Sequence, residues 1–397
     1  MSASGATSER TGRLRSRSSS KHPLPAGDSR EIDYDLHGLV GIRLVDASPR
    51  DAAAVTRQLG PIQARLEREP DIVIRFVDRL ATSSRLRHLG VEEAGFTDDA
   101  FLVLRSKHKA PAKVQIAFTE IGERCEIVCE RGLPAVPLLI PIVNLTVLHK
   151  GAVPLHASAF VHDGTGVVAT GWSKGGKTEA MLAFVSRGAQ YVGDEWVYIT
   201  GDGERVFGIP EPIRVWDWHL QELPRYRALA GRGERVRLRA IKSLLSLEGV
   251  FTTPRARSLA LARGFRRVAP LLRKQLFVDI PPERLVAGGL GTLSGGFERL
   301  FFLASHDAPD VRVEPIDPLE VGRRMVFSLQ HERLPFMTYY LMFRFAFPDR
   351  RNPVIEEAEE LQREALERVL AGKPAYAVYH PYPASIPALF DAMSPYC

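Results

Sequence analysis

The residues with the clearest capacity for chemistry form a glycine-rich run, Gly171-Trp-Ser-Lys-Gly-Gly-Lys-Thr178, which fits the pattern G-x-x-x-x-G-K-[ST]. In such a loop, backbone N–H groups surround phosphate oxygens, the lysine reaches the β- and γ-phosphates and the hydroxyl binds Mg²⁺. The pattern therefore predicts ATP binding by Gly171, Ser173, Lys174, Gly175, Gly176, Lys177 and Thr178. Whether Lys174 contacts phosphate or points into solvent stays open.

The segments on both sides of the loop agree with this prediction. Residues 167–170 predict a short strand, and residues 178–185 predict a helix. A helix that begins at the loop directs the positive end of its dipole toward a bound anion. The alternative, a glycine-rich turn with a chance Lys-Thr pair, does not require this order of strand, loop and helix.

A histidine lies in a predicted hairpin just before the loop. Residues 155–161 and 167–170 flank His162-Asp-Gly-Thr-Gly166 and predict two antiparallel strands that turn near Gly164. This register places His156 opposite Trp172, at the mouth of the loop. A single histidine is more often a hydrogen-bonded structural residue, so its role depends on what else meets it there.

An acidic pair follows the predicted helix. The helix ends at Gly188, residues 190–193 predict the next strand, and Asp194-Glu195 comes at the end of that strand. A strand–helix–strand unit is expected to place its two strands side by side with their carboxyl ends together. Asp194 and Glu195 should then face the loop, where a magnesium ligand or a base is needed. The alternative is a solvated turn.

These features together resemble the catalytic domain of HPr kinase/phosphorylase, a bacterial P-loop kinase with a core similar to phosphoenolpyruvate carboxykinase. The family pattern has a His, a G-D-S-G-x-G-K-S-E loop, a helix that ends in R-G and a strand that ends in A-D-D. Residues 155–199 carry His156, a loop that continues to Glu179, Arg187-Gly188 and Gly193-Asp-Glu195 at matching spacings. The resemblance adds Glu179 to the expected nucleotide-binding residues.

The resemblance also implies a catalytic role for each matching residue. Lys177 would bind the β- and γ-phosphates, and Thr178 and Glu195 would hold Mg²⁺. Asp194 would be the base that accepts the proton of the acceptor hydroxyl. His156 would lie beside the acceptor and assist proton transfer. The expected catalytic set is therefore His156, Lys177 and Asp194.

The implied activity is that of an ATP- and Mg²⁺-dependent kinase acting on a hydroxyl of a peptide, a protein or a small molecule. The family precedent also implies a homo-oligomer. Trp172, Lys174 and Glu195 replace the family's Asp, Gly and Asp, which indicates a divergent member. Two of these changes, Trp172 and Glu195, leave open a non-catalytic ATP-binding regulatory module. Carboxykinase chemistry would require a second-metal Lys/His set that is not recognisable in the sequence.

Charge is distributed unevenly along the 397 residues, whose formal net charge is +6. Residues 1–30 carry +4 and predict a disordered basic tail, and residues 224–275 carry +12, which leaves −10 for the rest. The 224–275 segment is either a solvated basic face or a dock for an acidic acceptor. No nucleic-acid module and no interleaved aromatic residues accompany it, so a nucleic-acid partner is not expected.

The whole pattern predicts an α/β fold with a P-loop kinase core of the HPr-kinase type. We expect an N-terminal α/β domain at 31–150, the P-loop domain at 151–317 and a helical C-terminal region at 318–397. In the N-terminal domain, strands are predicted at 72–77, 100–105, 113–118 and 125–129, and a helix at 51–68 that breaks at Gly60-Pro61. In the C-terminal region, Asn352-Pro353 predicts a capped helix start.

Three further observations concern the cellular compartment in which the protein is expected. Cys125 and Cys129 lie on one face of a predicted strand, without the spacing of a zinc site, and are expected to be buried thiols. The most apolar stretch, 133–148, is shorter than a membrane helix and contains three prolines, so no membrane contact is expected. The first residues lack the apolar core of a secretory signal. We expect a cytoplasmic protein.

Overall fold

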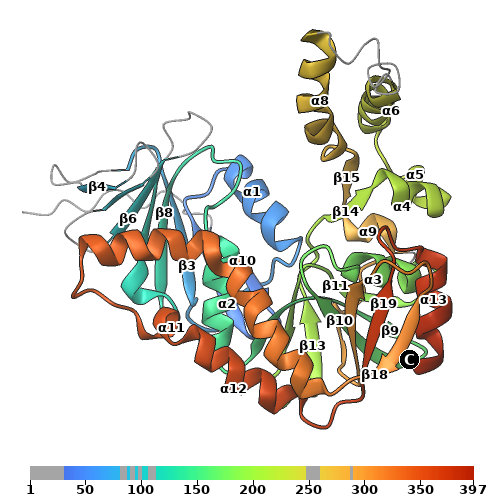
Figure 1. Ribbon diagram of the computed structural model, residues 1–397. Coiled ribbons are helices and arrows are strands. Elements are labelled where there is room, and N and C mark those ends of the chain that lie inside the picture. The colour runs from blue at the N-terminus through green and yellow to red at the C-terminus, as the bar shows by residue number, and fades with distance from the viewer. Residues whose placement is uncertain are drawn as a thin grey trace, which may run out of the picture.

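The computed structural model describes residues 31–80, 87–89, 94–96, 101–105, 113–246, 260–286 and 289–397 (Figure 1). The expected disordered tail at 1–30 lies outside the described residues. The described part is a mixed α/β structure with two large sheets and a two-stranded ribbon. No helix in this part is both long enough and apolar enough to cross a membrane.

The first sheet contains eight strands and belongs to the N-terminal part of the chain. Its spatial order is β1 (Ile32–Leu36), β2 (Val40–Val45), β3 (Ile72–Val77), β8 (Cys125–Glu130), β7 (Lys113–Ala117), β6 (Phe101–Arg105), β5 (Ala94–Phe96) and β4 (Arg87–Leu89). The four predicted strands are all present. Cys125 and Cys129 are both buried on β8, as expected, and burial raises the pKa of each thiol to about 12.

Helix α1 (Pro49–Leu59) lies against this sheet and shows how local sequence sets its ends. Ser48 caps its start and exchanges hydrogen bonds with Asp51. The helix stops before Gly60, whose φ of 76° is left-handed. The predicted break is confirmed, but the helix does not resume after Pro61, because the chain there makes an extended bridge to Tyr34 through Gln63.

The second sheet carries the glycine-rich loop. Its order is β16 (Ser294–Gly296), β13 (Arg205–Gly208), β12 (Trp196–Ile199), β9 (Val153–His162), β10 (Thr165–Gly171), β17 (Arg299–Ser305), β19 (Ala375–His380) and β18 (Arg312–Pro315). A further strand, β11 (Gln190–Gly193), pairs with β9. Strands β10, β17 and β19 run parallel, and β9 is antiparallel to β10.

The C-terminal part is not only helical. Its helices are α10 (Pro318–Ala346), α11 (Pro353–Glu356), α12 (Ala358–Leu370) and α13 (Ile386–Met393), but strand β19 enters the second sheet between β17 and β18. The expectation of a helical region at 318–397 is therefore wrong for β19, whose alternating Ala, Val and Tyr residues suit a strand with neighbours on both sides. Asn352 caps α11 as predicted, through a hydrogen bond from Ile355 N.

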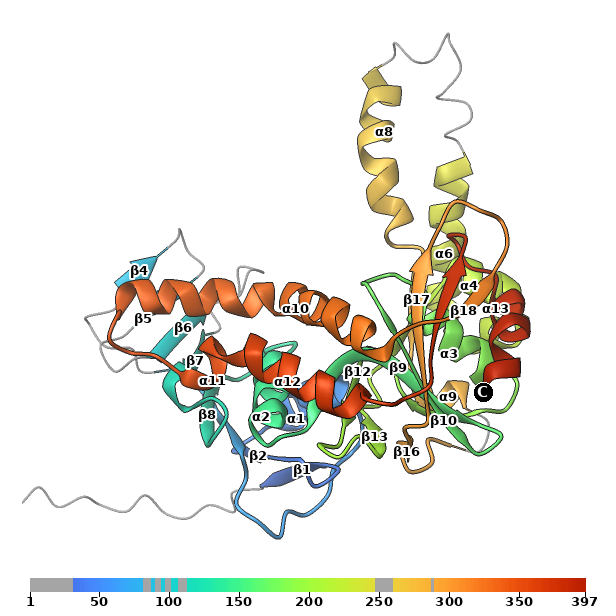
Figure 2. The ribbon, with the colours of Figure 1, turned by 60° about the horizontal axis from the view of Figure 1, so that its bottom comes forward.

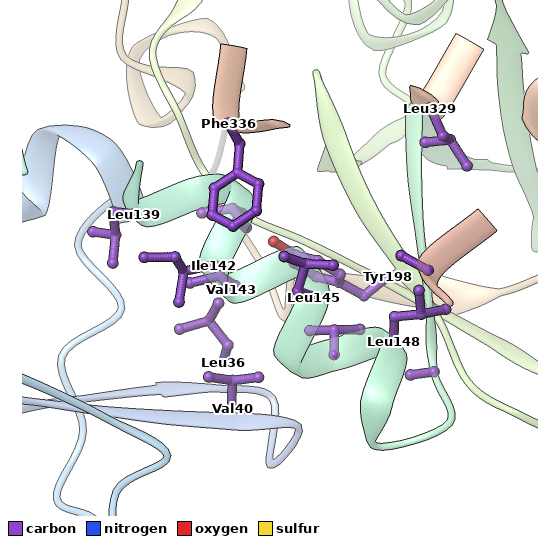
Figure 3. Packing of buried hydrophobic residues seen from close by; sticks show 14 of the residues in the cluster. Leu36, Val40, Leu139, Ile142, Val143, Leu145, Leu148, Tyr198, Leu329 and Phe336 are labelled. Atoms are coloured by element: carbon purple, nitrogen blue, oxygen red, sulfur yellow. The ribbon is translucent and has the colours of Figure 1, made fainter. Parts of the chain in front are cut away.

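One continuous apolar core joins the two sheets. Helix α2 (Leu139–His149) is apolar around most of its circumference and packs between them (Figure 3). Leu36 and Val40 of the first sheet, Tyr198 of β12 and Phe336 of α10 all belong to this cluster. A helix that is hydrophobic on all sides is stable only when it is enclosed in this way. The sheets are thus packed around a shared helix.

Two helices project from the rest of the molecule, α6 (Arg232–Ser246) and α8 (Ala260–Arg273) (Figures 1 and 2). We call them the arm. They are carried by a ribbon of β14 (Ile213–Trp216) and β15 (Phe277–Ile280), with the short helices α4 (Asp217–Glu222), α5 (Pro224–Arg227) and α9 (Pro282–Leu285) at its base. The described parts of the predicted basic segment, residues 224–246 and 260–275, form this arm together with α5 at its base.

Candidate active site

The glycine-rich loop connects β10 to helix α3 (Lys177–Val185), as the sequence predicted. None of its three glycines, Gly171, Gly175 and Gly176, has room for a side chain. A Cβ on Gly171 would lie 2.4 Å from Leu303 O, and one on Gly176, where φ is 101°, would lie 2.6 Å from His380 Nε2. The loop therefore packs directly on β17 and β19 and presents backbone amides at the start of α3, which is the arrangement that binds anions.

Lys177 is held inside the loop. Its side chain is only 6% exposed, and Nζ donates to Trp172 O at 3.0 Å. Its own carbonyl oxygen accepts from Ser158 Oγ at 2.7 Å, which ties the start of α3 to β9. Burial lowers the pKa of Lys177, while the nearby carboxylates of Glu195 and Asp194 act in the opposite direction. The lysine is positioned as a fixed cation at the centre of the loop.

Asp194 and Glu195 interrupt one continuous line of pairing along β9. Strand β11 pairs with one half of β9 and β12 with the other, both antiparallel to it. The register shifts between Tyr191 and Gly193, just before the acidic pair, and Glu195 takes a left-handed φ of 66°. Bulges of this kind redirect side chains beside functional sites, and a positive φ at a residue other than glycine is strained.

The expectation that the strand after α3 lies beside the strand before it is wrong, because β9 lies between β10 and β11. Strands β10 and β11 are both antiparallel to β9, so they run in the same direction and end at the same edge of the sheet. This edge is where the loop lies. The acidic pair therefore reaches the loop as predicted, although the strand order differs.

Asp194 contacts the loop directly. Its Oδ2 accepts a hydrogen bond from Thr178 Oγ1 at 3.0 Å, and its side chain is 3% exposed. Burial, followed by the charge of Glu195, raises the pKa of Asp194 to about 7. A carboxyl with a pKa near ambient pH can gain and lose a proton readily, which suits a general base.

His156 lies between two carboxylates. Its Nε2 is 3.0 Å from Glu195 Oε2, and its Nδ1 is 3.3 Å from Glu332 Oε1, close enough for an ion pair although not aligned as a hydrogen bond. Burial favours the neutral ring, but the two carboxylates outweigh it and raise the pKa of His156. Contact with His156 in turn lowers the pKa of Glu195.

The position of His156 differs by one residue from the expected register. The hairpin turns at Asp163-Gly164, both with positive φ, and pairs Thr170 with Ala157. His156 therefore faces the level of Gly171 and not Trp172, because a two-residue turn shifts the pairing relative to a turn centred on Gly164. On its other side His156 pairs with Trp196 of β12.

Helix α10 supplies two contacts that the sequence did not indicate. Glu332 reaches His156, and the ring of His331 stacks on Trp172, with ring centroids 5.0 Å apart. Both residues lie more than 150 positions from the loop in sequence, and no motif surrounds them. Their approach depends on how α10 packs against the second sheet, so no local pattern could have identified them.

Two more histidines make hydrogen bonds that hold the loop and the start of α3 in place. His219 Nδ1 accepts from Trp216 N at 3.1 Å, so Nε2 carries the proton and donates to Glu179 Oε1 at 3.0 Å. This buried hydrogen bond ties Glu179, and with it the start of α3, to α4. Burial alone would raise the pKa of Glu179, but the contact with His219 outweighs burial and lowers it. His380 Nε2 lies 2.8 Å from Gly175 O. Neither histidine was indicated by the sequence.

These groups surround one cavity of about 200 Å³. It brings together every predicted site residue except Gly171, together with three residues from the ribbon and the C-terminal part. The lining residues are His156, Ser173, Lys174, Gly175, Gly176, Lys177, Thr178, Glu179, Asp194, Glu195, Arg214, Trp216 and Tyr382. Arg214 pairs with Asp279 at 3.2 Å and stacks over Phe277. Lys174 is exposed at the rim, with no partner among the described residues.

The donor set around Thr178 is compatible with Mg²⁺. Within the described residues, no three His, Cys, Asp or Glu side chains form a ready-made metal site. Mg²⁺ bound with a nucleotide needs only one or two carboxylates in addition to phosphate oxygens and water. Thr178, Asp194 and Glu195 supply such oxygens. Glu211, whose pKa burial raises to about 8, has a buried carboxyl oxygen without a hydrogen-bond partner in the described part of the chain.

Comparison with known proteins adds no assignment. No protein-family model matches the chain, and no curated protein matches it either. The function is therefore argued from the geometry and the electrostatics of this cavity.

Proposed function

We propose that this protein is an ATP-dependent kinase with a P-loop core of the HPr-kinase type. It transfers the γ-phosphoryl group of ATP to a hydroxyl of a peptide, a protein or a small molecule. One observation carries the proposal. The base candidate Asp194 hydrogen-bonds the loop hydroxyl of Thr178, while its neighbour Glu195 hydrogen-bonds His156, all at the wall of one cavity.

ATP binding rests on the glycine-rich loop. Its backbone amides and the start of α3 receive the phosphates, and Lys177 neutralises their charge from inside the loop. Lys177 now donates to Trp172 O, so phosphate binding exchanges that hydrogen bond for a stronger one to an ionised oxygen. Arg214 also lines the cavity and adds a further cation.

Thr178 and Glu195 would hold Mg²⁺, for which their hydroxyl and carboxylate oxygens are suitable ligands. When bound, the ion neutralises charge that develops on the phosphate oxygens during transfer. The remaining chemistry is assigned to the chain itself. Glu195 stays ionised, because its hydrogen bond with His156 lowers its pKa.

Asp194 accepts the proton of the acceptor hydroxyl. The acceptor oxygen forms a bond to the γ-phosphorus, the bond from that phosphorus to the oxygen of ADP breaks, and the proton goes to the Asp194 carboxylate. A pKa of about 7 leaves a substantial ionised fraction at neutral pH. His156 lies between Glu195 and Glu332, which raise its pKa and so favour the protonated ring beside the acceptor.

The test is ATP consumption by purified protein and by two variants. Lys177→Ala is expected to lose ATP binding and turnover, and Asp194→Asn is expected to keep binding but lose turnover by a factor of about 10² or more. Lys150→Ala, at a residue that does not line the cavity, is the matched control. Binding is followed by tryptophan fluorescence, because Trp172 is half-exposed in the loop and stacks on His331.

The same measurements separate the kinase from a non-catalytic regulatory module. A regulatory module would bind ATP through the loop, with Lys177→Ala again deficient, but the unaltered protein would turn over no ATP with any hydroxyl acceptor. Full turnover by Lys177→Ala would contradict both assignments. Full turnover by Asp194→Asn would remove Asp194 from the role of base.

A further inference from the structure

A groove with a basic rim lies between α4 and α6 at the base of the arm. It measures about 60 Å³, and its floor is formed by Leu220 and Leu238, both buried. Around the floor stand Arg227, Arg235 and Arg239. The groove thus combines an apolar base with guanidinium groups, as sites for acidic, partly apolar peptides do.

The positive charge of this rim is not neutralised from within the described part of the chain. Among the described residues that line the groove, Asp217 is the only acidic one, and it is already paired with Lys242 at 2.7 Å. Arg227, Arg235 and Arg239 have no ion pair or hydrogen bond from their side chains to any described residue. Arg235 and Arg239 are four positions apart on α6 and so share one face. Three cations side by side repel one another unless an anion lies between them.

The groove is fixed rigidly to the candidate active site. Helix α4 begins directly after Trp216, which lines the active-site cavity, and His219 of α4 bonds Glu179 of α3 at 3.0 Å. At the other end of α3, Arg225 donates to Val185 O at 3.2 Å. Helix α4 therefore connects the groove to the active-site cavity, and a segment seated in the groove would lie on the same elements that hold α3 in place.

We propose that this groove binds an acidic, amphipathic segment of the protein acceptor and so holds the acceptor beside the phosphate loop. This inference rests on the proposed kinase function and narrows its acceptor to a protein or peptide with a docking segment apart from its reacting hydroxyl. Carboxylates of the segment pair with Arg227, Arg235 and Arg239, and its apolar side chains contact Leu238 and exposed apolar residues of the arm such as Val236.

A peptide fits this surface better than a nucleic acid. Single-stranded nucleic acids bind on aromatic rings that stack with bases, but no aromatic side chain is among the described residues that line this groove. Tyr226 of α5 is buried, and Trp218 of α4 is partly buried against the core. The arm instead exposes Val236, Leu244, Val268 and Leu271 to solvent. Exposed aliphatic side chains among cations are complementary to a peptide in which acidic and apolar residues alternate.

The test measures binding without ATP. The probe is a fluorescein-labelled peptide of alternating glutamate and leucine pairs, and its fluorescence anisotropy is titrated with the full-length protein. Arg235→Glu/Arg239→Glu is expected to bind at least about tenfold more weakly. The control, Arg50→Glu/Arg79→Glu, has the same net charge but changes exposed residues of the N-terminal part, and should bind as the unaltered protein does. Raising the salt from about 50 mM to about 300 mM should weaken binding of the unaltered protein most.

Each outcome decides the proposal. An equal loss of peptide affinity in both charge-reversed variants would show that binding responds to net charge alone, and it would overturn the proposal. Tighter binding of duplex or single-stranded DNA than of the peptide would overturn it as well. No binding of the probe at low salt would also overturn it. Circular dichroism and an unchanged midpoint of urea unfolding show that Arg235→Glu/Arg239→Glu is folded. If the unaltered protein binds the probe but consumes no ATP, the kinase function fails while the groove remains a docking site.

Discussion

Replacing Asp194 with asparagine should make the ligand-free protein more stable above neutral pH while removing its proposed base. The carboxyl is 3% exposed, and burial raises its pKa from an ordinary value of 3.8 to about 7. Asparagine has the same shape and can still accept the hydrogen bond from Thr178. It carries no charge at any pH, so it removes the cost of ionising a buried group.

The sign of the effect follows from proton binding. Between pH 4 and pH 7 the folded protein holds a proton on Asp194 that the unfolded chain has released, so the free energy of unfolding falls as the pH rises. The full free-energy cost of ionising Asp194 applies once the pH exceeds the pKa of this carboxyl in the folded protein. About three pKa units at about 1.4 kcal/mol each give about 4 kcal/mol over the whole window. From pH 5 to pH 8 the free energy of unfolding of the unaltered protein should fall by about 3 kcal/mol because of this group, and Asp194→Asn should not show this fall.

The assay is urea unfolding of the ligand-free protein at pH 5, 6.5 and 8, with a chelator to exclude divalent metals. With an m-value of about 3 kcal/mol per molar urea, the difference corresponds to a midpoint shift of about 1 M between the two proteins at pH 8. Asp163→Asn is the matched control, because Asp163 lies exposed in the hairpin turn. Parallel loss of stability in the unaltered protein and Asp194→Asn between pH 5 and pH 8 would refute the reasoning.

Three further predictions concern the loop, a helix cap and the thiols. Gly176→Ala should lose nucleotide binding in the fluorescence titration and about 1–3 kcal/mol of stability, because its φ is 101° and the new Cβ would meet His380. Asn352→Ala should cost about 2–4 kcal/mol in urea unfolding, because its buried side chain caps α11 and donates to two carbonyls of the N-terminal part. Cys125 and Cys129, with pKa values of about 12, should resist thiol reagents until urea unfolds the protein.

These predictions fail in distinguishable ways. Unimpaired nucleotide binding by Gly176→Ala would mean that the loop can move away from β19. A cost below about 0.5 kcal/mol for Asn352→Ala would mean that water replaces its hydrogen bonds. Rapid labelling of the native thiols at pH 8 would show that β8 opens to solvent.

Local sequence was sufficient wherever short-range rules decide the structure. The strand, the glycine-rich loop and the start of α3 follow from residues 167–185, because a turn with positive φ at Gly176 and a helix after Lys177 are specified within one short segment. Asn352-Pro353 specified its own helix start. Spacing along the chain also indicated that Asp194 and Glu195 would reach the loop.

Where the chain pairs with distant segments, the sequence was insufficient. The insertion of β9 between β10 and β11 and the entry of β19 beside β17 depend on backbone hydrogen bonds between segments far apart in sequence. Both positions are favourable only when the neighbouring strands are already in place. The one-residue difference at His156 has a similar origin, since the type of turn sets the register of the whole hairpin.

The sequence by itself determined the glycine-rich loop, its flanking strand and helix, and the set of residues that can do chemistry. Tertiary structure alone decided their surroundings: the placing of Glu332 and His331 at the loop by α10, the support of Glu179 by His219, and the burial of Asp194. The physical reason is that residue type sets what a group can do, whereas its pKa and partners depend on solvent exclusion and charge. Those are properties of packing between elements distant in the chain.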